Sequence, residues 1–281
     1  MDDIPASVES KELGEKIMKD TETLLAEKNF KIKKWTFSGQ MNTKNKSKDQ
    51  VAVQTLLRKE ISNELSKVLG MEWDERNDVI KFTINYLGKE ESTKRACLST
   101  ICSIYDPLGL LAPVTASAKI ILRKMWAHKP KIDWDDPLPT EIQKEWSSFR
   151  ESLRYVASLH FNRSLRPEDG TSPKLIIFSD GSKDAFSAVA YVRWKTALGF
   201  ESRLIAAKTR IAPLRVVDIV RLELCGAVLN ARLFKFILQE VDAIQFKSFH
   251  HIIDSEIVKA MIGWDSYGFR TFAANRIGEI Q

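Results

Sequence analysis

The spacing of hydrophobic residues changes along the chain, and each kind of spacing predicts a helix, a strand or a loop. Apolar residues at helical spacing predict amphipathic helices over 11–29 and 51–69, because positions three and four apart share one helix face. Alternating or short apolar runs predict strands over residues 30–37, 71–73 and 79–84. The lysine-rich stretch 39–49 is almost free of apolar residues and is typical of a loop or linker.

The middle of the chain is predicted to be helical, with breaks rich in turn formers. Helical periodicity covers residues 93–105, 114–126 and 139–155. Asp106-Pro-Leu-Gly109 ends the first of these helices, and a tryptophan-bearing turn precedes the third. That turn holds a dense acidic cluster, which favours turn chemistry and helix capping over metal binding because no EF-hand spacing follows it (Asp133, Asp135 and Asp136). The loop formers of residues 163–173 mark the best domain boundary.

The last third predicts a mixed α/β fold. Three strands are expected as a meander, then a long helix, a fourth strand and a further helix, over residues 175–178, 185–194, 204–209, 217–241, 251–255 and 256–264. The chain as a whole therefore reads as α/β (α+β), with a mostly helical region followed by a mixed sheet with flanking helices.

Three carboxylates occupy matching places in this order of elements. Asp180 ends the first strand, Glu223 lies in the first turns of the long helix, and Asp254 ends the fourth strand. Each alone also fits a turn, a solvated helix face or a helix cap. Together they can meet at one edge of the sheet, where their mutual repulsion calls for metal ions. Two hard cations about 3.5–4 Å apart are the usual solution for in-line attack on a phosphodiester.

Composition narrows the class without deciding the function. The 281 residues are 44% apolar and 28% charged, which is typical of a globular chain and excludes a disordered or fibrous one. No apolar run is long enough for a membrane span, and no signal peptide is recognisable. An odd number of cysteines indicates reduced thiols in an intracellular protein (Cys97, Cys102 and Cys225). The net charge of +6 permits a polyanionic partner.

Several motifs resemble the polyprotein of BEL/Pao-type LTR retrotransposons. The Asp180-Gly-Ser strand, the Arg221-Leu-Glu-Leu-Cys-Gly-Ala helix and Ile253-Asp-Ser-Glu-Ile-Val resemble its ribonuclease H domain. Other matching segments lie along the rest of the chain: Lys94-Arg95, Asp106-Pro-Leu-Gly-Leu-Leu-Ala-Pro113, Ile132-Asp-Trp-Asp-Asp-Pro-Leu-Pro139, Ala206-Ala-Lys-Thr-Arg-Ile-Ala-Pro213 and Phe272-Ala-Ala-Asn-Arg-Ile-Gly-Glu-Ile280.

The resemblance implies three regions. Residues 1–46 would be the end of a reverse-transcriptase palm, 47–164 a thumb- or connection-like region, and 165–281 a ribonuclease H-like domain truncated before its fifth strand and fourth acidic residue. Asp2 and Asp3 resemble the vestige of a polymerase metal site, without the parts that DNA synthesis needs. Phosphate contacts are expected from basic residues in these regions, namely Lys33, Lys34, Lys44, Lys46, Lys48 and Arg221.

The same resemblance implies an activity and its partners. Asp180, Glu223 and Asp254 would be the catalytic residues and would hold two Mg²⁺ or Mn²⁺ ions to cut RNA in RNA–DNA hybrids. The expected partners are a hybrid or template-primer and other parts of the polyprotein, such as the reverse-transcriptase fingers and palm and the integrase, with no membrane. The expected location is intracellular, in a cytoplasmic virus-like particle or the nucleus.

Two other functions stay open from the sequence. The chain could be a catalytically dead transposon remnant that only binds nucleic acid. An aspartic peptidase is a weaker alternative, because retroviral-type peptidases need Asp-Thr-Gly or Asp-Ser-Gly and this chain has Asp180-Gly-Ser instead. Serine-hydrolase and P-loop motifs are absent from the sequence.

Overall fold

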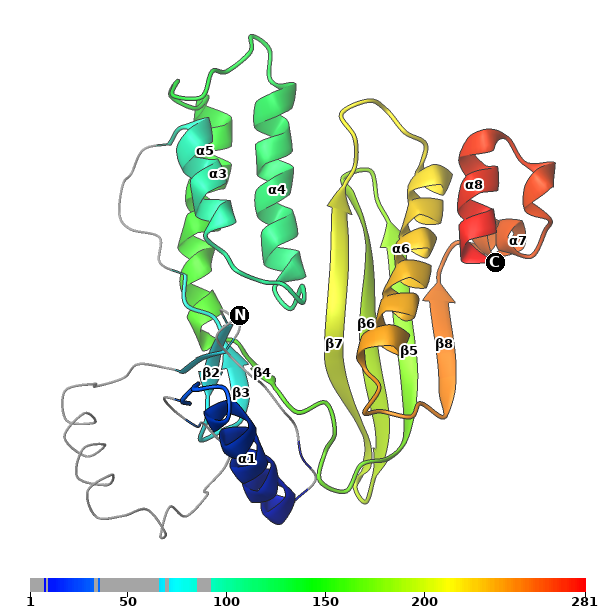
Figure 1. Cartoon of the computed structure of the whole chain (residues 1–281). Coiled ribbons are helices and arrows are strands. Elements are labelled where there is room, and N and C mark those ends of the chain that lie inside the picture. The colour runs from blue at the N-terminus through cyan, green and yellow to red at the C-terminus, as the bar shows by residue number, and fades with distance from the viewer. Residues whose placement is uncertain (1–7, 9, 33–34, 36–65, 69–70, 85–91) are drawn as a thin grey trace. The chain divides into compact units, whose positions relative to one another are not determined.

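The computed structural model describes residues 10–32, 66–68, 71–84 and 92–281, together with residues 8 and 35. The chain forms two compact units, Met1–Phe82 and Thr83–Gln281 (Figure 1). The domain bounds expected from the sequence, at residues 46/47 and 164/165, stay predictions.

The first unit contains a helix and a small antiparallel meander. Helix α1 (Lys11–Ala26) begins at Ser10, whose hydroxyl accepts from the Leu13 backbone N–H at 3.2 Å, as an N-cap does. Strands β1 (Ser66–Val68), β2 (Met71–Asp74) and β3 (Val79–Lys81) pair in order. The Asp74 carboxylate closes the β2–β3 turn by accepting from Lys81 at 2.7 Å.

Two expectations for this unit are wrong within the described residues. The helix expected over 51–69 does not include Ser66–Val68, which pair with β2; the rest of that range lies outside the described residues. The strand expected from Phe30 onward does not begin there. Asn29 has a φ of 58°, and the Phe30 N–H donates to the Leu25 carbonyl, so these residues form the C-terminal turn of α1 instead.

The second unit begins with three helices that match the predicted ones closely. They are α3 (Lys94–Cys102), α4 (Ala112–Ala127) and α5 (Thr140–Ser152), followed by the 3₁₀ turn η1 (Leu153–Ser158) and the short strand β4 (His160–Asn162). Helix α4 packs against both α3 and α5. Their shared core is apolar and includes Cys97, Leu111, Ala118, Met125, Trp146 and Leu153.

A four-stranded mixed sheet follows. Strands β5 (Thr171–Gly181), β6 (Ala185–Thr196) and β7 (Gly199–Ile211) form an antiparallel meander, and β8 (Ser248–Ile253) joins β5 in parallel, giving the order β7-β6-β5-β8. Helix α6 (Ile219–Glu240) lies across one face (Figure 1). The core between them consists of apolar side chains, among them Leu175, Ile177, Ala190, Val192, Leu229, Leu233 and Ile237. The mixed α/β fold class expected from the sequence is confirmed.

Differences from the predicted elements concern their bounds and one missed helix. The fourth strand, expected over 251–255, is β8 and ends at Ile253, before Asp254. β5 and β7 extend well beyond the expected 175–178 and 204–209. β5 pairs with β6 from Thr171 to Gly181, and β7 pairs with β6 from Gly199 to Ile211. After α7 (Glu256–Ile262) and the turn η2 (Ser266–Gly268), α8 (Thr271–Ile280) packs on α6. The sequence interpretation assigned no element to α8.

The Asp106-Pro-Leu-Gly segment attaches α4 to the edge strand β7. The Asp106 carboxylate accepts from the backbone N–H groups of Leu110 and Leu111, each at 2.8 Å, at the start of α4. The Leu108 carbonyl then accepts from the Ala207 N–H of β7 at 2.8 Å. Gly109, at a φ of 75°, leaves no room for a side chain, since a Cβ there would lie 2.1 Å from the Ala207 carbonyl oxygen. This segment therefore covers part of an otherwise open sheet edge.

A second attachment fixes α4 beyond this segment. The Arg123 guanidinium of α4 forms an ion pair with Asp184 at 3.2 Å, in the β5–β6 turn. It also donates to the Pro213 carbonyl at 3.1 Å, just after β7. The helices α3–α5 and the sheet consequently belong to one packed unit. None of the helices in the described ranges has both the length and the apolar character needed to cross a bilayer.

Candidate metal centre

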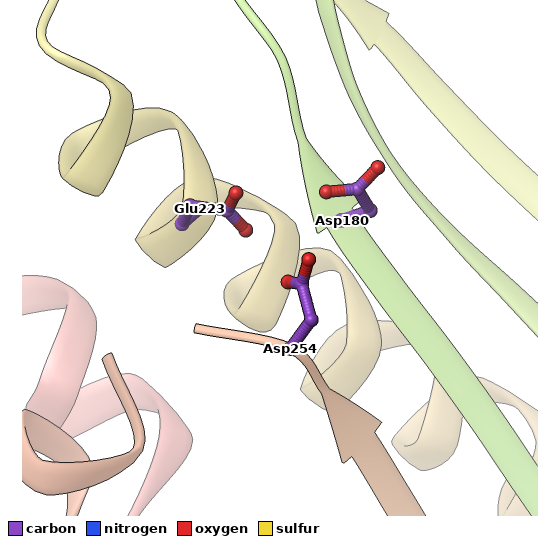
Figure 2. Close-up of side chains that lie close together, drawn as sticks. All are labelled: Asp180, Glu223 and Asp254. Carbon is purple, nitrogen blue, oxygen red and sulfur yellow. The ribbon is translucent and has the colours of Figure 1, made fainter. Parts of the chain in front are cut away.

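The three carboxylates singled out by the sequence lie together in the structure (Figure 2). Asp180 is the next-to-last residue of β5, Glu223 is in the first turns of α6, and Asp254 directly follows β8. One oxygen from each lies within 4.8 Å of the others. In Figure 2 their carboxyl groups point toward one another from three different elements. Their catalytic role stays a prediction, but residues 31 to 74 positions apart in sequence converge as that prediction requires.

The parallel pairing of β5 and β8 accounts for two of the three positions. The last paired residues are Ser179 and Ile253. Asp180 and Asp254 are therefore the next position on each strand, side by side at the same end of the sheet. Parallel strands bring their carboxyl ends to one edge, so each strand needs only an aspartate at its end to place it here.

Two glycines let α6 approach β5 closely enough to bring in Glu223. A Cβ at Gly181 would lie 2.4 Å from the Glu223 backbone nitrogen, and a Cβ at Gly226 would lie 2.8 Å from the Asp180 carbonyl oxygen. The Gly181 N–H donates both to Asp180 Oδ1 at 2.7 Å and to Glu223 Oε2 at 3.1 Å. One backbone N–H thus joins the two carboxylates.

The electrostatics of the site are unbalanced. The pKa of Glu223 is raised above its usual value, first because partial burial penalises the charged form and then because Asp254 and Asp180 repel it; the Gly181 hydrogen bond opposes these effects. In the part of the chain that the structure describes, no Lys, Arg or His forms an ion pair with any of the three. Asp180 and Asp254 are exposed to solvent.

This donor set fits a hard divalent cation. Carboxylate oxygens are the ligands that Mg²⁺ and Mn²⁺ prefer, and a cation would neutralise the repulsion that the protein itself leaves uncompensated. Exposure of two of the three carboxylates would leave coordination positions of such a cation open to water and other ligands.

Sequence comparison places this geometry in a known family. The family model described as Pao retrotransposon-like RNaseH-like domain matches residues 93–255, more than half of the chain. The chain belongs to this family. The match begins at the N-cap of α3 and ends just after Asp254, so it includes all three carboxylates and the segment that attaches α4 to β7. No curated protein matches the chain.

Of the residues predicted to bind nucleic acid in this Pao-type chain, only Arg221 lies among the described residues. Arg221 pairs with Asp218 at 3.0 Å, and its guanidinium lies over the Phe272 ring of α8, 5.1 Å from the ring centre. It is exposed and sits two residues before Glu223. The other residues predicted to bind nucleic acid lie outside the described residues: Lys33, Lys34, Lys44, Lys46 and Lys48. Asp2 and Asp3, predicted as the vestige of a polymerase metal site, also lie outside them.

The acidic turn before α5 in the Pao-type chain has structural partners. Asp136 accepts from the Asp133 backbone N–H at 2.8 Å, and Asp135 pairs with Arg95 at 2.7 Å. The Arg95 N–H also donates to the Trp134 carbonyl. These bonds agree with the turn chemistry predicted for the cluster.

Sequence reasoning missed the residues that connect the elements of the site. Gly181 and Gly226 were read only as parts of motifs, and Asn230 was not singled out. A signal for Asn230 was present, because it follows Glu223 and Gly226 at helical spacing, on the face of α6 that meets the sheet. A polar residue on an otherwise apolar face requires a partner.

Proposed function

We propose that this Pao-type domain cuts the RNA strand of RNA–DNA hybrids by metal-dependent hydrolysis. The observation that carries the proposal is the convergence of Asp180, Glu223 and Asp254 within 4.8 Å, without a cationic partner among the described residues. Membership in a ribonuclease H-like family supports the choice of nucleic acid as the partner and of a hybrid as the substrate.

The exposure of each carboxylate indicates its role in the proposed reaction. Asp180 and Asp254, being exposed, would face the ions and the scissile phosphate, while the half-buried Glu223 would hold an ion from the helix side. Bound divalent cations supply an activated water and stabilise the charge on the leaving oxygen. The Gly181 N–H fixes the relative orientation of Asp180 and Glu223 before any substrate arrives.

The direct test is cleavage of a labelled RNA–DNA hybrid by the full chain with Mg²⁺ or Mn²⁺. We expect cleavage of the RNA strand and none of a DNA duplex of the same sequence. Asp180→Asn should abolish it, exceeding the ~10–100-fold loss typical of residues that only support a metal ligand. Asp242→Asn, which removes an exposed carboxylate after the other end of α6, is the matched control and should cleave like the wild type.

The alternatives give different outcomes in the same assay. A remnant that only binds nucleic acid would show salt-sensitive binding of the hybrid and no metal-dependent cleavage. An aspartic peptidase would cleave a peptide substrate in a pepstatin-sensitive manner. Cleavage of the hybrid that survives Asp180→Asn would contradict the proposed site.

A further inference from the structure

One buried amide connects the three elements that carry the carboxylates, because it lies on α6 and contacts both β5 and β8. Asn230, in the middle of α6, is 2% exposed. Its side-chain nitrogen donates to the Ile177 carbonyl at 3.1 Å and to the Ser179 hydroxyl at 3.2 Å, both on β5. Its side-chain oxygen accepts from Nδ1 of His251, on β8, at 2.6 Å. Asn230 and Ser179 are two of the three buried polar or charged residues in the described part of the chain.

The position of these bonds along the strands relates them to the site. Ile177 and His251 are partners in the β5–β8 register. Asp180 and Asp254 lie three residues further along the same two strands, about 10 Å away at ~3.3 Å per residue. Asn230 itself lies two helical turns after Glu223, on the same face of α6. The amide therefore bridges one register pair of the strands whose ends hold two carboxylates, from the helix that holds the third.

β8 depends on such directional bonds because little of it is buried. Within the described sheet it is an edge strand that pairs only with β5. Its side chains from Phe249 to Ile252 are exposed, at 45% for Phe249 and 42% for Ile252. A slip of one residue would move Asp254 by ~3.3 Å and turn its side chain to the other face. Weak apolar burial alone does not forbid that slip.

The Phe234 ring orients His251 for its hydrogen bond to Asn230. Its ring packs against the Phe234 ring of α6, with 4.8 Å between centres and an angle of 78° between planes. Because the Asn230 nitrogen donates to a carbonyl, the Asn230 oxygen must be the acceptor, and Nδ1 of His251 carries the proton. Asn230 is buried and cannot exchange this bond for water without leaving the core, whereas His251 lies on the exposed edge strand and is held there by this bond and by the Phe234 ring.

We propose that Asn230 and His251 are positioning residues that hold Asp180 and Asp254 in metal-binding register. This inference rests on the proposed function, since it assigns the pair a role in the same site. It predicts that removing the amide weakens metal binding beyond any loss of fold stability.

The test compares two truncations one turn apart on α6 in the full chain. Asn230→Ala removes the bonds to β5 and β8, and Leu233→Ala removes an equally buried side chain of the same core, 2% exposed, that makes no such bond. Both should lower the melting temperature. At a temperature where circular dichroism shows both to be folded, Mn²⁺ titration followed by electron paramagnetic resonance should show ~10–100-fold weaker binding for Asn230→Ala only.

A second pair of variants separates the hydrogen bond from the packing of His251. In His251→Asn the amide nitrogen can take the place of Nδ1, so Mn²⁺ affinity should stay within a few-fold of the wild type. In His251→Leu no donor remains, and affinity should fall as in Asn230→Ala. Equal Mn²⁺ affinity in Asn230→Ala and Leu233→Ala, or in the two His251 variants, would overturn the proposal.

Failure of the nuclease proposal gives a separate result. A wild-type chain that binds Mn²⁺ through Asp180 but leaves the hybrid intact would refute the nuclease function, and the Mn²⁺ comparison would still decide the role of Asn230. A wild-type chain whose Mn²⁺ binding is absent, or is unaffected by Asp180→Asn, would refute both.

Discussion

Gly226 of α6 lies directly against the backbone of Asp180 on β5, so that a Cβ at Gly226 would come 2.8 Å from the Asp180 carbonyl oxygen. Gly181 makes the reciprocal approach to Glu223. Each glycine neighbours a carboxylate on the opposite element. The distance between helix and strand, and with it the distance between Asp180 and Glu223, is therefore set by the absence of two side chains.

Gly226→Ala should force α6 away from β5. We expect it to destabilise the fold by ~1–3 kcal/mol, as overpacking does, and to weaken Mn²⁺ binding by separating Glu223 from Asp180. Urea unfolding and metal titration measure the two effects. Gly278→Ala is the control, because a Cβ there meets only the Ser266 side chain at 3.6 Å, an ordinary contact. Its effect should be neutral or stabilising, by ~0.5–1 kcal/mol for a helical glycine.

Divalent cations should stabilise the protein itself. A ligand that binds only the folded state raises the free energy of unfolding, and the increase grows with the ligand concentration. Mn²⁺ at about 100 times its Kd should therefore raise the free energy of unfolding by ~2.7 kcal/mol. That corresponds to a rise in Tm of roughly 5–10 °C by thermal denaturation. Asp254→Asn should remove most of the rise. A rise of the same size in this variant would place the bound ion elsewhere.

Removing the charge of Glu223 should stabilise the metal-free protein at neutral pH. Its pKa is raised in the folded state, so the folded chain binds this proton more readily than the unfolded chain. The stability it contributes is present below the usual value of 4.5 and is lost as the pH rises through the folded pKa. In the presence of EDTA, Glu223→Gln should therefore be more stable than wild type at pH 7, and this advantage should shrink at pH 4.

The comparison needs a carboxylate outside the cluster. Glu168→Gln, which neutralises an exposed carboxylate in the loop before β5, is the control. A Glu223→Gln variant less stable than the wild type at pH 7 would mean that its carboxylate is stabilised by an interaction stronger than the repulsion from Asp180 and Asp254.

Acid should weaken the fold through His251. Burial lowers the pKa of its imidazole, and His250 lowers it further. A base with a lowered folded pKa contributes stability above its unfolded value of 6.5, and this is lost as the pH falls through the folded pKa. Unfolding by urea at pH 7.5, 6.5 and 5.5 should show a decline in the wild type that is smaller in His251→Asn. An identical decline in both would assign the acid sensitivity to other groups.

The close approach of Gly109 to β7 can be tested with glycine-to-alanine variants whose stability is measured by urea unfolding. Gly109→Ala combines a φ of 75° with a clash against the Ala207 carbonyl, so we expect a loss of ~2–4 kcal/mol. Gly268→Ala has open space around its Cβ and an ordinary φ, and should change little. Sedimentation velocity should also show self-association of Gly109→Ala if the β7 edge becomes available for pairing.

The site was predictable to the extent that local chain signals define it. Asp180 and Asp254 follow short apolar runs, and Glu223 lies in the first turns of a strongly periodic helix, so their order on the elements follows from the hydrophobic pattern. The connection through Asn230 was not predictable in this way, because its partners on β5 and β8 come from pairing 21 to 53 residues away. The helical spacing puts Asn230 on an apolar face, a signal that the sequence interpretation did not use and that names no partner for it.

The errors in the predicted elements also arise from contacts between residues far apart in the sequence. Residues 66–68 fit a helical period, yet in the structure they pair with β2, so tertiary pairing overrides local propensity there. β5 and β7 continue past the apolar runs that predicted them, because pairing with β6 extends each ladder without burial of most of the added side chains. The Asp106-Pro-Leu-Gly motif signalled a break correctly, but only the fold shows that it meets β7, about a hundred residues later.

The attachment of this segment to β7 also has a consequence for biosynthesis. A ribosome makes the chain from its N-terminus, so α3, α4 and the Leu108 carbonyl are complete long before β7 emerges. The Asp106-Pro-Leu-Gly segment is therefore synthesised before β7, the edge strand that it covers. The nascent sheet thus meets its own helical partner first, and the interval in which β7 could pair with a neighbouring polypeptide is short.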